Sequence, residues 1–225
     1  KNIDLKLLKK RQAKLHNFKD LLGNGIEELK LIGKENLLSK LLIYIDILKK
    51  WNKKYNLTSL TNDEEIIKNH LLDSLSISKL IEQKKIIDVG SGAGFPGIIL
   101  ALYDQSRHVT LIDKVGKKTA FMKQVCLELE LKNVSVIHSR VEELDHNNHY
   151  FDAVIARAFG DMSLLIKLTK RLIDKKGVWY GMKSKKIMEE DFIKQKYSYE
   201  IYDIKVPYLE ADRYLVKIKN NEGVT

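Results

Sequence analysis

Segment 88–97 reads Asp-Val-Gly-Ser-Gly-Ala-Gly-Phe-Pro-Gly, with three glycines at alternate positions after a short apolar run. Glycine lets a backbone turn tightly and approach a bound molecule closely, because it has no Cβ. Asp113 ends a second apolar run, Thr110-Leu111-Ile112, and lies 23 residues after Gly90. A carboxylate at that place can accept hydrogen bonds from ribose hydroxyls. Together these features predict a nucleoside-binding site at the ends of neighbouring strands.

Three kinds of glycine loop can be compared with this segment. A phosphate-binding loop ends in Gly-Lys-Ser or Gly-Lys-Thr, which is absent here. The dinucleotide fingerprint needs a third glycine at the position that Phe95 occupies. The remaining pattern, Asp-x-Gly-x-Gly-x-Gly, resembles that of class I S-adenosylmethionine (AdoMet) methyltransferases. AdoMet has no phosphate, so the loop around Gly90 and Gly92 only has to admit a nucleoside and an amino-acid tail.

Methyl transfer needs a nucleophile in line with the S–C bond, and the neighbouring residues favour some nucleophiles over others. No Pro-Pro motif follows the strand that ends near Arg157, which argues against an exocyclic amine. Cys126 lies within a helical pattern and is interpreted as a small buried hydrophobe rather than a nucleophile. Ribose 2′-oxygen methylation usually uses a Lys-Asp-Lys-Glu group. The candidate aspartate, Asp152, begins its strand and is therefore expected far from the edge of the sheet that binds the ligand. Arg157 is no base at neutral pH, which permits guanine N7 as the acceptor without selecting it.

The residues before the loop are expected to form a helical extension, 1–83. Apolar side chains recur at helical spacing over 8–22 and over 38–48. Gly23 and Gly25 lie between these two stripes and are expected to separate two helices.

A third helix is expected before the sheet begins. Thr61 with Glu64 three residues later matches a capping box, which predicts where this helix starts. The apolar pattern carries the helix to about Ile81.

Short apolar runs alternate with helical patterns over 84–225, as in the βαβ units of a parallel sheet. Five runs predict parallel strands at 86–89, 109–112, 134–137, 151–156 and 178–182. A helix is expected after Lys186, followed by an antiparallel edge hairpin over 199–206 and 213–219. The predicted fold is α/β: a Rossmann-like, mostly parallel seven-stranded sheet of the class I methyltransferase type, on which the helical extension packs.

Several linked segments resemble the RsmG (GidB) family, which methylates guanine N7 in bacterial small-subunit (16S) ribosomal RNA. The resemblance runs from about Trp51 to Lys183 and includes the Gly-Phe-Pro-Gly ending of the loop. The matching segments are Trp51-Asn52, Asn56-Leu57-Thr58, His70 to Leu75, Asp88 to Leu100, Lys117 to Phe121, Arg140-Val141-Glu142 and Ala156-Arg157-Ala158. The resemblance implies AdoMet-dependent methylation of 16S rRNA at the guanine-527 site.

The resemblance also implies the residues of the site. AdoMet would contact Gly90, Phe95, Val141, Glu142 and Arg157, with the backbone of Val141 and Glu142 facing the adenine. The loop pattern and the strand end add Gly92 and Asp113 to the cofactor contacts. Substrate contacts are expected from His70, Lys118, Arg157 and Lys183. No residue is assigned as a catalytic base.

Two pairs of side chains each have two interpretations. Trp51 and Tyr55 are four residues apart, a spacing more typical of a core than of a base-stacking surface. His70 and Asp73 share one helix face and either contact a ligand or join the helix to the sheet.

The charge distribution favours an RNA partner. The net charge is +10, but lysine provides 34 of the 40 basic residues, and a lysine-rich composition alone can produce such an excess. The excess is uneven, with +8 in residues 1–60 and +7 in residues 163–186. We therefore expect an RNA-facing rim around a neutral cofactor loop, with 16S rRNA, the 30S subunit or an assembly intermediate as the partner.

Composition excludes several other classes. A single cysteine rules out an internal disulfide and favours the cytoplasm, and no apolar stretch approaches the roughly 18 residues of a membrane span. Asp145, His146 and His149 lack further spaced ligands, so no metal is expected. Two other functions stay open: a small-molecule AdoMet methyltransferase, and a non-catalytic RNA- or ribosome-binding module on the same fold.

Overall fold

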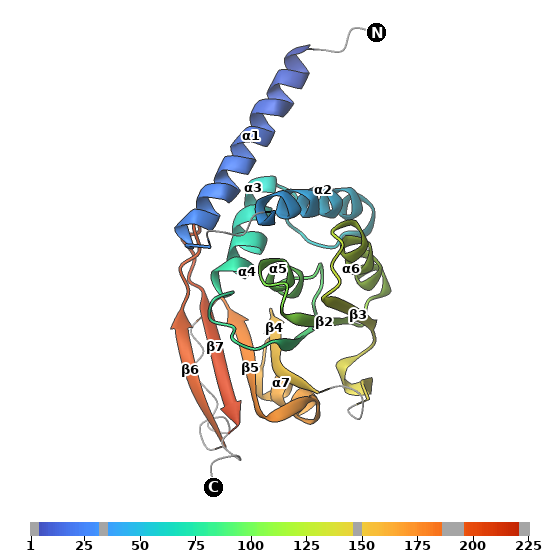
Figure 1. Ribbon diagram of the computed structural model, residues 1–225, viewed down its shortest axis with the longest axis vertical. Coiled ribbons are helices and arrows are strands. Elements are labelled where there is room, and N and C mark those ends of the chain that lie inside the picture. Colours follow the sequence, from blue (N-terminus) through green and yellow to red (C-terminus); the bar gives the residue numbers. More distant parts are fainter. Residues whose placement is uncertain (1–4, 32–35, 146–149, 186–195, 221–225) are drawn as a thin grey trace.

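The computed structural model describes residues 5–31, 36–145, 150–185 and 196–220, without the side chains of residues 5–16 and 220. Figure 1 shows a long first helix that extends away from a body built on one sheet. The helices are α1 (Leu5–Glu28), α2 (Leu37–Tyr55), α3 (Asp63–Ile66), the π-helix η1 (Ile67–Leu72), α4 (Asp73–Ser76), α5 (Gly97–Tyr103), α6 (Gly116–Glu128), α7 (Met162–Thr169) and the 3-10 turns η2 (Val141–Glu143) and η4 (Lys170–Leu172). The strands are β1 (Lys85–Val89), β2 (His108–Asp113), β3 (Val134–His138), β4 (Phe151–Arg157), β5 (Ile173–Lys183), β6 (Tyr197–Asp203) and β7 (Tyr214–Asn220).

The strands form one sheet in the order β3-β2-β1-β4-β5-β7-β6. β1 to β5 pair in parallel, while β7 pairs antiparallel with both β5 and β6. The predicted seven-stranded, mostly parallel sheet with an antiparallel edge hairpin is confirmed. The strand order reverses between β1 and β4, and open α/β sheets bind ligands at the carboxyl ends of the strands beside such a switch point.

β5 is longer than the apolar run that predicted it. It begins at Ile173, which pairs with Phe151, whereas the run begins at Val178. The polar residues 174–176 are exposed, so the start of the strand carries no apolar pattern. The helix predicted after Lys186 lies outside the described residues.

The expected break at Gly23 and Gly25 is wrong, because both glycines lie inside α1. A Cβ at Gly25 would come within 2.7 Å of the Leu72 side chain. The glycine therefore serves close packing of two helices rather than a turn. Packing against η1 stabilises the helical conformation enough to offset the low helix propensity of glycine.

The predicted capping box is also wrong. Asn62 is the residue that caps α3, and its side-chain oxygen accepts a hydrogen bond from the backbone N–H of Glu64 at 2.9 Å. The helical run then passes through a π-helical turn and ends at Ser76, before the expected end at Ile81. The apolar periodicity continued past Ser76 because Ile77 and Ile81 are buried in non-helical structure.

The two faces of the sheet are covered by different helices. Val109 and Leu111 of β2 belong to a large apolar cluster with α2, α5 and α6. Ile112, the next residue of the same strand, packs in a second cluster that includes α7. This alternation along a strand is the period-2 pattern of a buried sheet. Trp51 lies 5.2 Å from Tyr55 between ring centroids and packs partly buried against the first cluster, which confirms the core interpretation of this pair.

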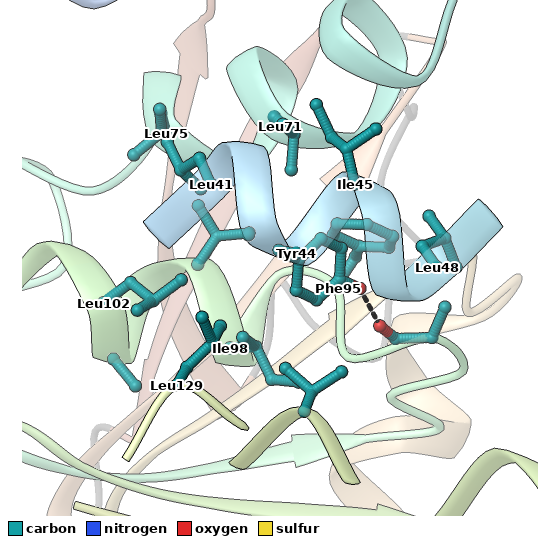
Figure 2. Close-up of a cluster of buried hydrophobic side chains, with 14 of the residues drawn as sticks. Leu41, Tyr44, Ile45, Leu48, Leu71, Leu75, Phe95, Ile98, Leu102 and Leu129 are labelled. Carbon is teal, nitrogen blue, oxygen red and sulfur yellow. Dashed lines mark hydrogen bonds between the residues drawn. The ribbon is translucent and has the colours of Figure 1, made fainter. Parts of the chain in front are cut away.

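One buried tyrosine connects the helical extension to the glycine loop. Figure 2 shows Tyr44 of α2 beside Phe95, with a dashed line from its hydroxyl. The hydroxyl of Tyr44 donates a hydrogen bond to the carbonyl of Ala93, in the middle of the loop. The ring of Tyr44 also meets the ring of Phe95 edge to face, with centroids 5.3 Å apart. α2 therefore helps to fix the conformation of the loop.

We expect Tyr44→Phe to destabilise the protein by about 1–2 kcal/mol, because the buried Ala93 carbonyl loses its donor while ring packing is retained. Chemical denaturation measures this free energy of unfolding. Tyr55→Phe is the matched control on the same helix, and its effect should stay within about 0.5 kcal/mol. Equal effects of the two substitutions would show that the Tyr44 hydroxyl does not stabilise the loop.

Candidate functional site

The glycines of the loop between β1 and α5 have two different roles. Gly90, Gly92 and Gly94 adopt positive φ angles of 70°, 62° and 85°, which favour glycine. A Cβ at Gly94 would collide with Ile98, so this glycine serves packing inside the protein. A Cβ at Gly90 would meet no atom within 4 Å. The open space beside Gly90 is therefore where a ligand can approach the backbone.

Asp88 lies fully buried beneath the loop. Its Oδ2 accepts a hydrogen bond from the backbone N–H of Gly97 at 2.9 Å, which anchors the start of α5. Its Oδ1 has no hydrogen-bond partner among the described residues. Burial raises the pKa of Asp88 to about 7, while the Gly97 N–H and the Arg157 guanidinium lower it. An unpaired buried carboxylate oxygen beside a glycine cradle fits the ammonium-bearing tail of AdoMet, directly or through water.

The raised pKa of Asp88 predicts a pH dependence of stability. An unfolded aspartate titrates near about pH 4, so the folded state binds the extra proton between about pH 4 and about pH 7. The free energy of unfolding without ligand should therefore fall as pH rises through this range. Asp88→Asn removes the titration, so chemical denaturation should show its stability, relative to wild type, increasing from about pH 5 to about pH 8. A constant difference between the two proteins would contradict the assignment.

Asp113 lies at the end of β2, buried and turned toward the loop. Its two carboxylate oxygens accept hydrogen bonds from the backbone N–H groups of Gly92 at 3.0 Å and Val115 at 2.9 Å. The Lys118 ammonium lies 3.7 Å from the same carboxylate. Lys118 is expected to contact the substrate, and the structure places its ammonium beside Asp113, the predicted ribose acceptor. Each carboxylate oxygen retains a lone pair that can accept a ribose hydroxyl.

The turn after β3 is fixed by an arginine that the sequence reading missed. Arg171 donates hydrogen bonds from Nη2 to the carbonyls of Val141 and Glu142, both at 2.8 Å. The Val141 side chain is buried and that of Glu142 is exposed. The backbone expected to face an adenine is therefore anchored to η4, which directly follows α7. No local pattern around Arg171 indicates this contact, because the two segments are far apart in the sequence.

Arg157 ends β4 and reaches the helical extension. Its Nη1 donates to the carbonyl of Asn69 at 3.1 Å and lies 3.5 Å from a carboxylate oxygen of Asp73. Its guanidinium carbon lies 4.9 Å from the centroid of the Phe95 ring, on which the His70 ring also stacks at 4.5 Å. Phe95 thus brings the glycine loop, the end of β4 and η1 to one point.

Asp73 holds a second arginine that the sequence reading also missed. This second arginine is Arg213, which directly precedes β7. The other carboxylate oxygen of Asp73 accepts a hydrogen bond from Nε of Arg213 at 3.1 Å. Burial raises the pKa of Asp73, and the guanidinium groups of Arg157 and Arg213 act in the opposite direction. Asp73 thus joins the helix to the sheet through two arginines, and it also lines the hollow described next.

These groups line a hollow of about 510 Å³, which we call the arginine pocket. Its lining consists of Asn69, His70, Asp73, Arg157, Ala158, Phe159, Gly160, Met182, Lys183, Ser184, Lys185 and Arg213. The Lys183 ammonium donates to the carbonyls of Phe159 and Gly160. The pocket therefore joins three of the four predicted substrate residues, His70, Arg157 and Lys183, and carries four cationic side chains against one carboxylate.

Two residues considered in the sequence lie away from this pocket. Cys126 is half-buried on α6, and burial raises the pKa of its thiol to about 11, which keeps it protonated at neutral pH. Asp152 lies at the amino end of the sheet, where its carboxylate accepts a hydrogen bond from the backbone N–H of Lys85. Neither side chain is placed to act on a ligand at the carboxyl ends of the strands.

The described part of the chain carries neither a metal-binding cluster nor a membrane span. No group of three or more histidine, cysteine, aspartate or glutamate side chains placed to hold a metal occurs there. Of the three residues Asp145, His146 and His149, considered above as metal ligands, both histidines lie outside the described residues. No described helix is both long enough and apolar enough to span a membrane.

Comparisons with known proteins point to one family. Residues 37–213 match the GidB family, described as rRNA small subunit methyltransferase G. Ribosomal RNA small subunit methyltransferase G of Hydrogenovibrio crunogenus is 41% identical over 186 residues, which cover 80% of this chain and 84% of that protein. The protein of the same name from Methylobacillus flagellatus is 41% identical over 195 residues, covering 87% of this chain and 95% of the relative.

Solved structures share the fold at low sequence identity. A methyltransferase from Geobacter sulfurreducens superposes with a TM-score of 0.54 at 11% identity, covering 78% of this chain and 89% of that chain. TYW2 of M. jannaschii, solved in complex with AdoMet, gives 0.51 at 19% identity over 68% of this chain and 77% of its own. The family match spans both the glycine loop and the arginine pocket. The chain belongs to the rRNA small subunit methyltransferase G family and is an AdoMet-dependent rRNA methyltransferase.

Proposed function

We propose that this chain methylates N7 of a guanine in 16S rRNA, at the position equivalent to guanine 527. The observation that supports this choice is the absence of a competent general base among the described residues of the arginine pocket. Burial and the Arg157 guanidinium lower the pKa of His70 to about 4, so the neutral ring is a weak base. Asp73 is held by two arginines, and Lys183 donates to two carbonyls as an ammonium does.

Guanine N7 suits a pocket of this kind. It carries a lone pair and no proton, so the acceptor needs no deprotonation before it reacts. O6 lies next to N7 and is an acceptor for arginine and lysine, so donors on O6 can hold the base while the N7 lone pair stays free to react. Arg157, Lys183 and Arg213 are therefore proposed to orient the base through O6, while the stacked rings of His70 and Phe95 lie beside them.

The chain's own residues would act by placement and electrostatics. We propose that Gly90, Gly92, Asp113 and the backbone of Val141 and Glu142 would hold AdoMet, together with Phe95 and Arg157. AdoMet, when bound, supplies a methyl group on a sulfonium, which leaves as a neutral thioether while N7 takes the methyl and the positive charge. Asp73, beside Arg157, keeps a carboxylate near this developing charge. Holding both reactants in line lowers the activation barrier, because the two molecules no longer have to meet in the right orientation.

The experiment that tests this proposal uses the purified chain, radiolabelled AdoMet, and 30S subunits or 16S rRNA lacking the modification. Borohydride and aniline cleave RNA at 7-methylguanosine, and primer extension then maps the position. We expect one new cleavage site at the proposed guanine. Methyl transfer to another atom or position would contradict the assignment, and transfer only to small molecules would favour the small-molecule alternative. AdoMet and RNA binding without turnover would favour the binding module.

The same proposal gives the organisation and location of the protein. We propose that residues 1–83 are a helical extension that positions the glycine loop, and that residues 84–225 are the methyltransferase domain. The Tyr44 contacts with Ala93 and Phe95 support this division of roles. A 16S rRNA acceptor, free or within a 30S particle, places the enzyme in the cytoplasm, where ribosomes are assembled.

A further inference from the structure

Thr58 lies next to the arginine pocket without lining it. Its hydroxyl is 2.9 Å from Nε2 of His70, and the side chain is partly buried. The backbone of Thr58 is held on both sides by one amide side chain: Asn52 Nδ2 donates to its carbonyl at 3.0 Å, and its N–H donates to Asn52 Oδ1 at 2.9 Å. The backbone that carries the hydroxyl is thus anchored to α2.

The contacts of His70 favour one arrangement of protons. Its Nδ1 lies 3.0 Å from the carbonyl of Asn69, which also accepts from Arg157. With the proton on Nδ1, the ring donates to this carbonyl and its Nε2 accepts from the Thr58 hydroxyl. The Thr58 oxygen in turn accepts from the N–H of Leu60 at 3.2 Å, so every donor has an acceptor. The other tautomer would set the lone pairs of Nδ1 and the carbonyl against each other.

The π-helical turn explains why the Asn69 carbonyl is available. In an α-helix the N–H of Asp73 would donate to the carbonyl of Asn69, four residues earlier. Here that N–H donates to the carbonyls of Lys68 and His70 instead. With the proton on Nδ1, the Asn69 carbonyl accepts from both the Arg157 guanidinium and the His70 ring, whose Nη1 and Nδ1 lie 3.1 Å apart.

We propose that Thr58 is a positioning residue for methyl transfer. Its hydroxyl fixes the His70 ring flat against Phe95, and the Asn69 carbonyl, which this ring shares, holds the Arg157 guanidinium over the same aromatic face. This inference rests on the proposed role of Arg157 at the acceptor. Without the hydroxyl, Nε2 becomes a buried acceptor with no donor, and the ring is free to leave Phe95. The expected consequence is a guanidinium that is present but poorly oriented.

Kinetics test this role with nearly isosteric variants. Thr58→Val should lower kcat by about tenfold with an AdoMet Kd within about twofold of wild type, and Thr58→Ser should recover most of the loss. Thr61→Val, on an exposed threonine three residues away, is the matched control and should have no effect. Adding Thr58→Val to His70→Ala should cost little further, because Thr58 acts through the ring. Unchanged kcat in Thr58→Val, or fully additive losses, would overturn the proposal.

A second measurement does not depend on the RNA reaction. Long-range ¹H–¹⁵N correlation spectra of ¹⁵N-histidine protein report the state of each ring nitrogen, and His70→Gln assigns the His70 signals among six histidines. We expect the proton on Nδ1 in wild type, and a shift of the Nε2 signal in Thr58→Val that Thr58→Ser does not show. A proton on Nε2 would overturn the proposed tautomer, and no change in Thr58→Val would refute the contact. These spectra stay informative if the guanine assignment fails.

Discussion

Arg157→Ala is expected to lower kcat/KM for methyl transfer by about 100- to 1,000-fold while the fold is retained. The guanidinium is the cation that contacts Asn69 and Asp73 while lying over Phe95, so it adjoins both the glycine loop and the arginine pocket. Its removal leaves Asp73 paired with Arg213, which limits the loss of stability. A methyltransferase assay with a parallel thermal melt measures both properties.

Arg157→Lys separates the effect of the charge from that of the planar guanidinium. Lysine keeps the charge but not the planar group that donates in two directions and lies over an aromatic ring. We therefore expect Arg157→Lys to recover only a small part of the activity. Activity of Arg157→Ala within about threefold of wild type, with a normal melt, would remove Arg157 from the reaction.

The second large effect is expected at Asp113. Asp113→Ala should weaken AdoMet binding by about 30- to 100-fold, because the ribose loses a charged acceptor and the N–H groups of Gly92 and Val115 lose theirs. Calorimetry with AdoMet and the purified protein measures this change. The loop contact should make the effect larger than that of a ribose contact alone.

Two further aspartate variants test whether the effect is specific. Asp113→Asn keeps one acceptor oxygen, so its affinity should lie between those of wild type and Asp113→Ala. Asp152→Ala changes the same residue type at the opposite end of the sheet and should leave AdoMet affinity within about twofold. Wild-type affinity in Asp113→Ala would contradict the ribose role.

The sheet and the glycine loop could be predicted from the sequence because their signals are local. Strands such as 109–112 appear as apolar runs, and the alternate glycines after β1 need no distant partner to be recognised. The helical extension was harder. The low helix propensity of Gly23 and Gly25 predicted a break, but packing against Leu72 requires a glycine inside α1. Tertiary contact outweighed local propensity there.

The contacts that assemble the arginine pocket could not be predicted in the same way. Asp73 meets Arg157 and Arg213 across long stretches of chain, and Arg171 reaches the turn at Val141 from η4. No spacing rule relates such residues, because the topology of the sheet decides which strand ends are neighbours. The π-helical turn depends likewise on the side chains that bind the Asn69 carbonyl.

The measurement that tests the central claim most directly is site-resolved nucleoside mass spectrometry of 16S rRNA from cells lacking this chain. We expect 7-methylguanosine to be lost at the proposed guanine, restored by the wild-type chain, and not restored by Arg157→Ala expressed at the same level. Retention of full 7-methylguanosine at that position in the cells lacking the chain would contradict the function proposed here.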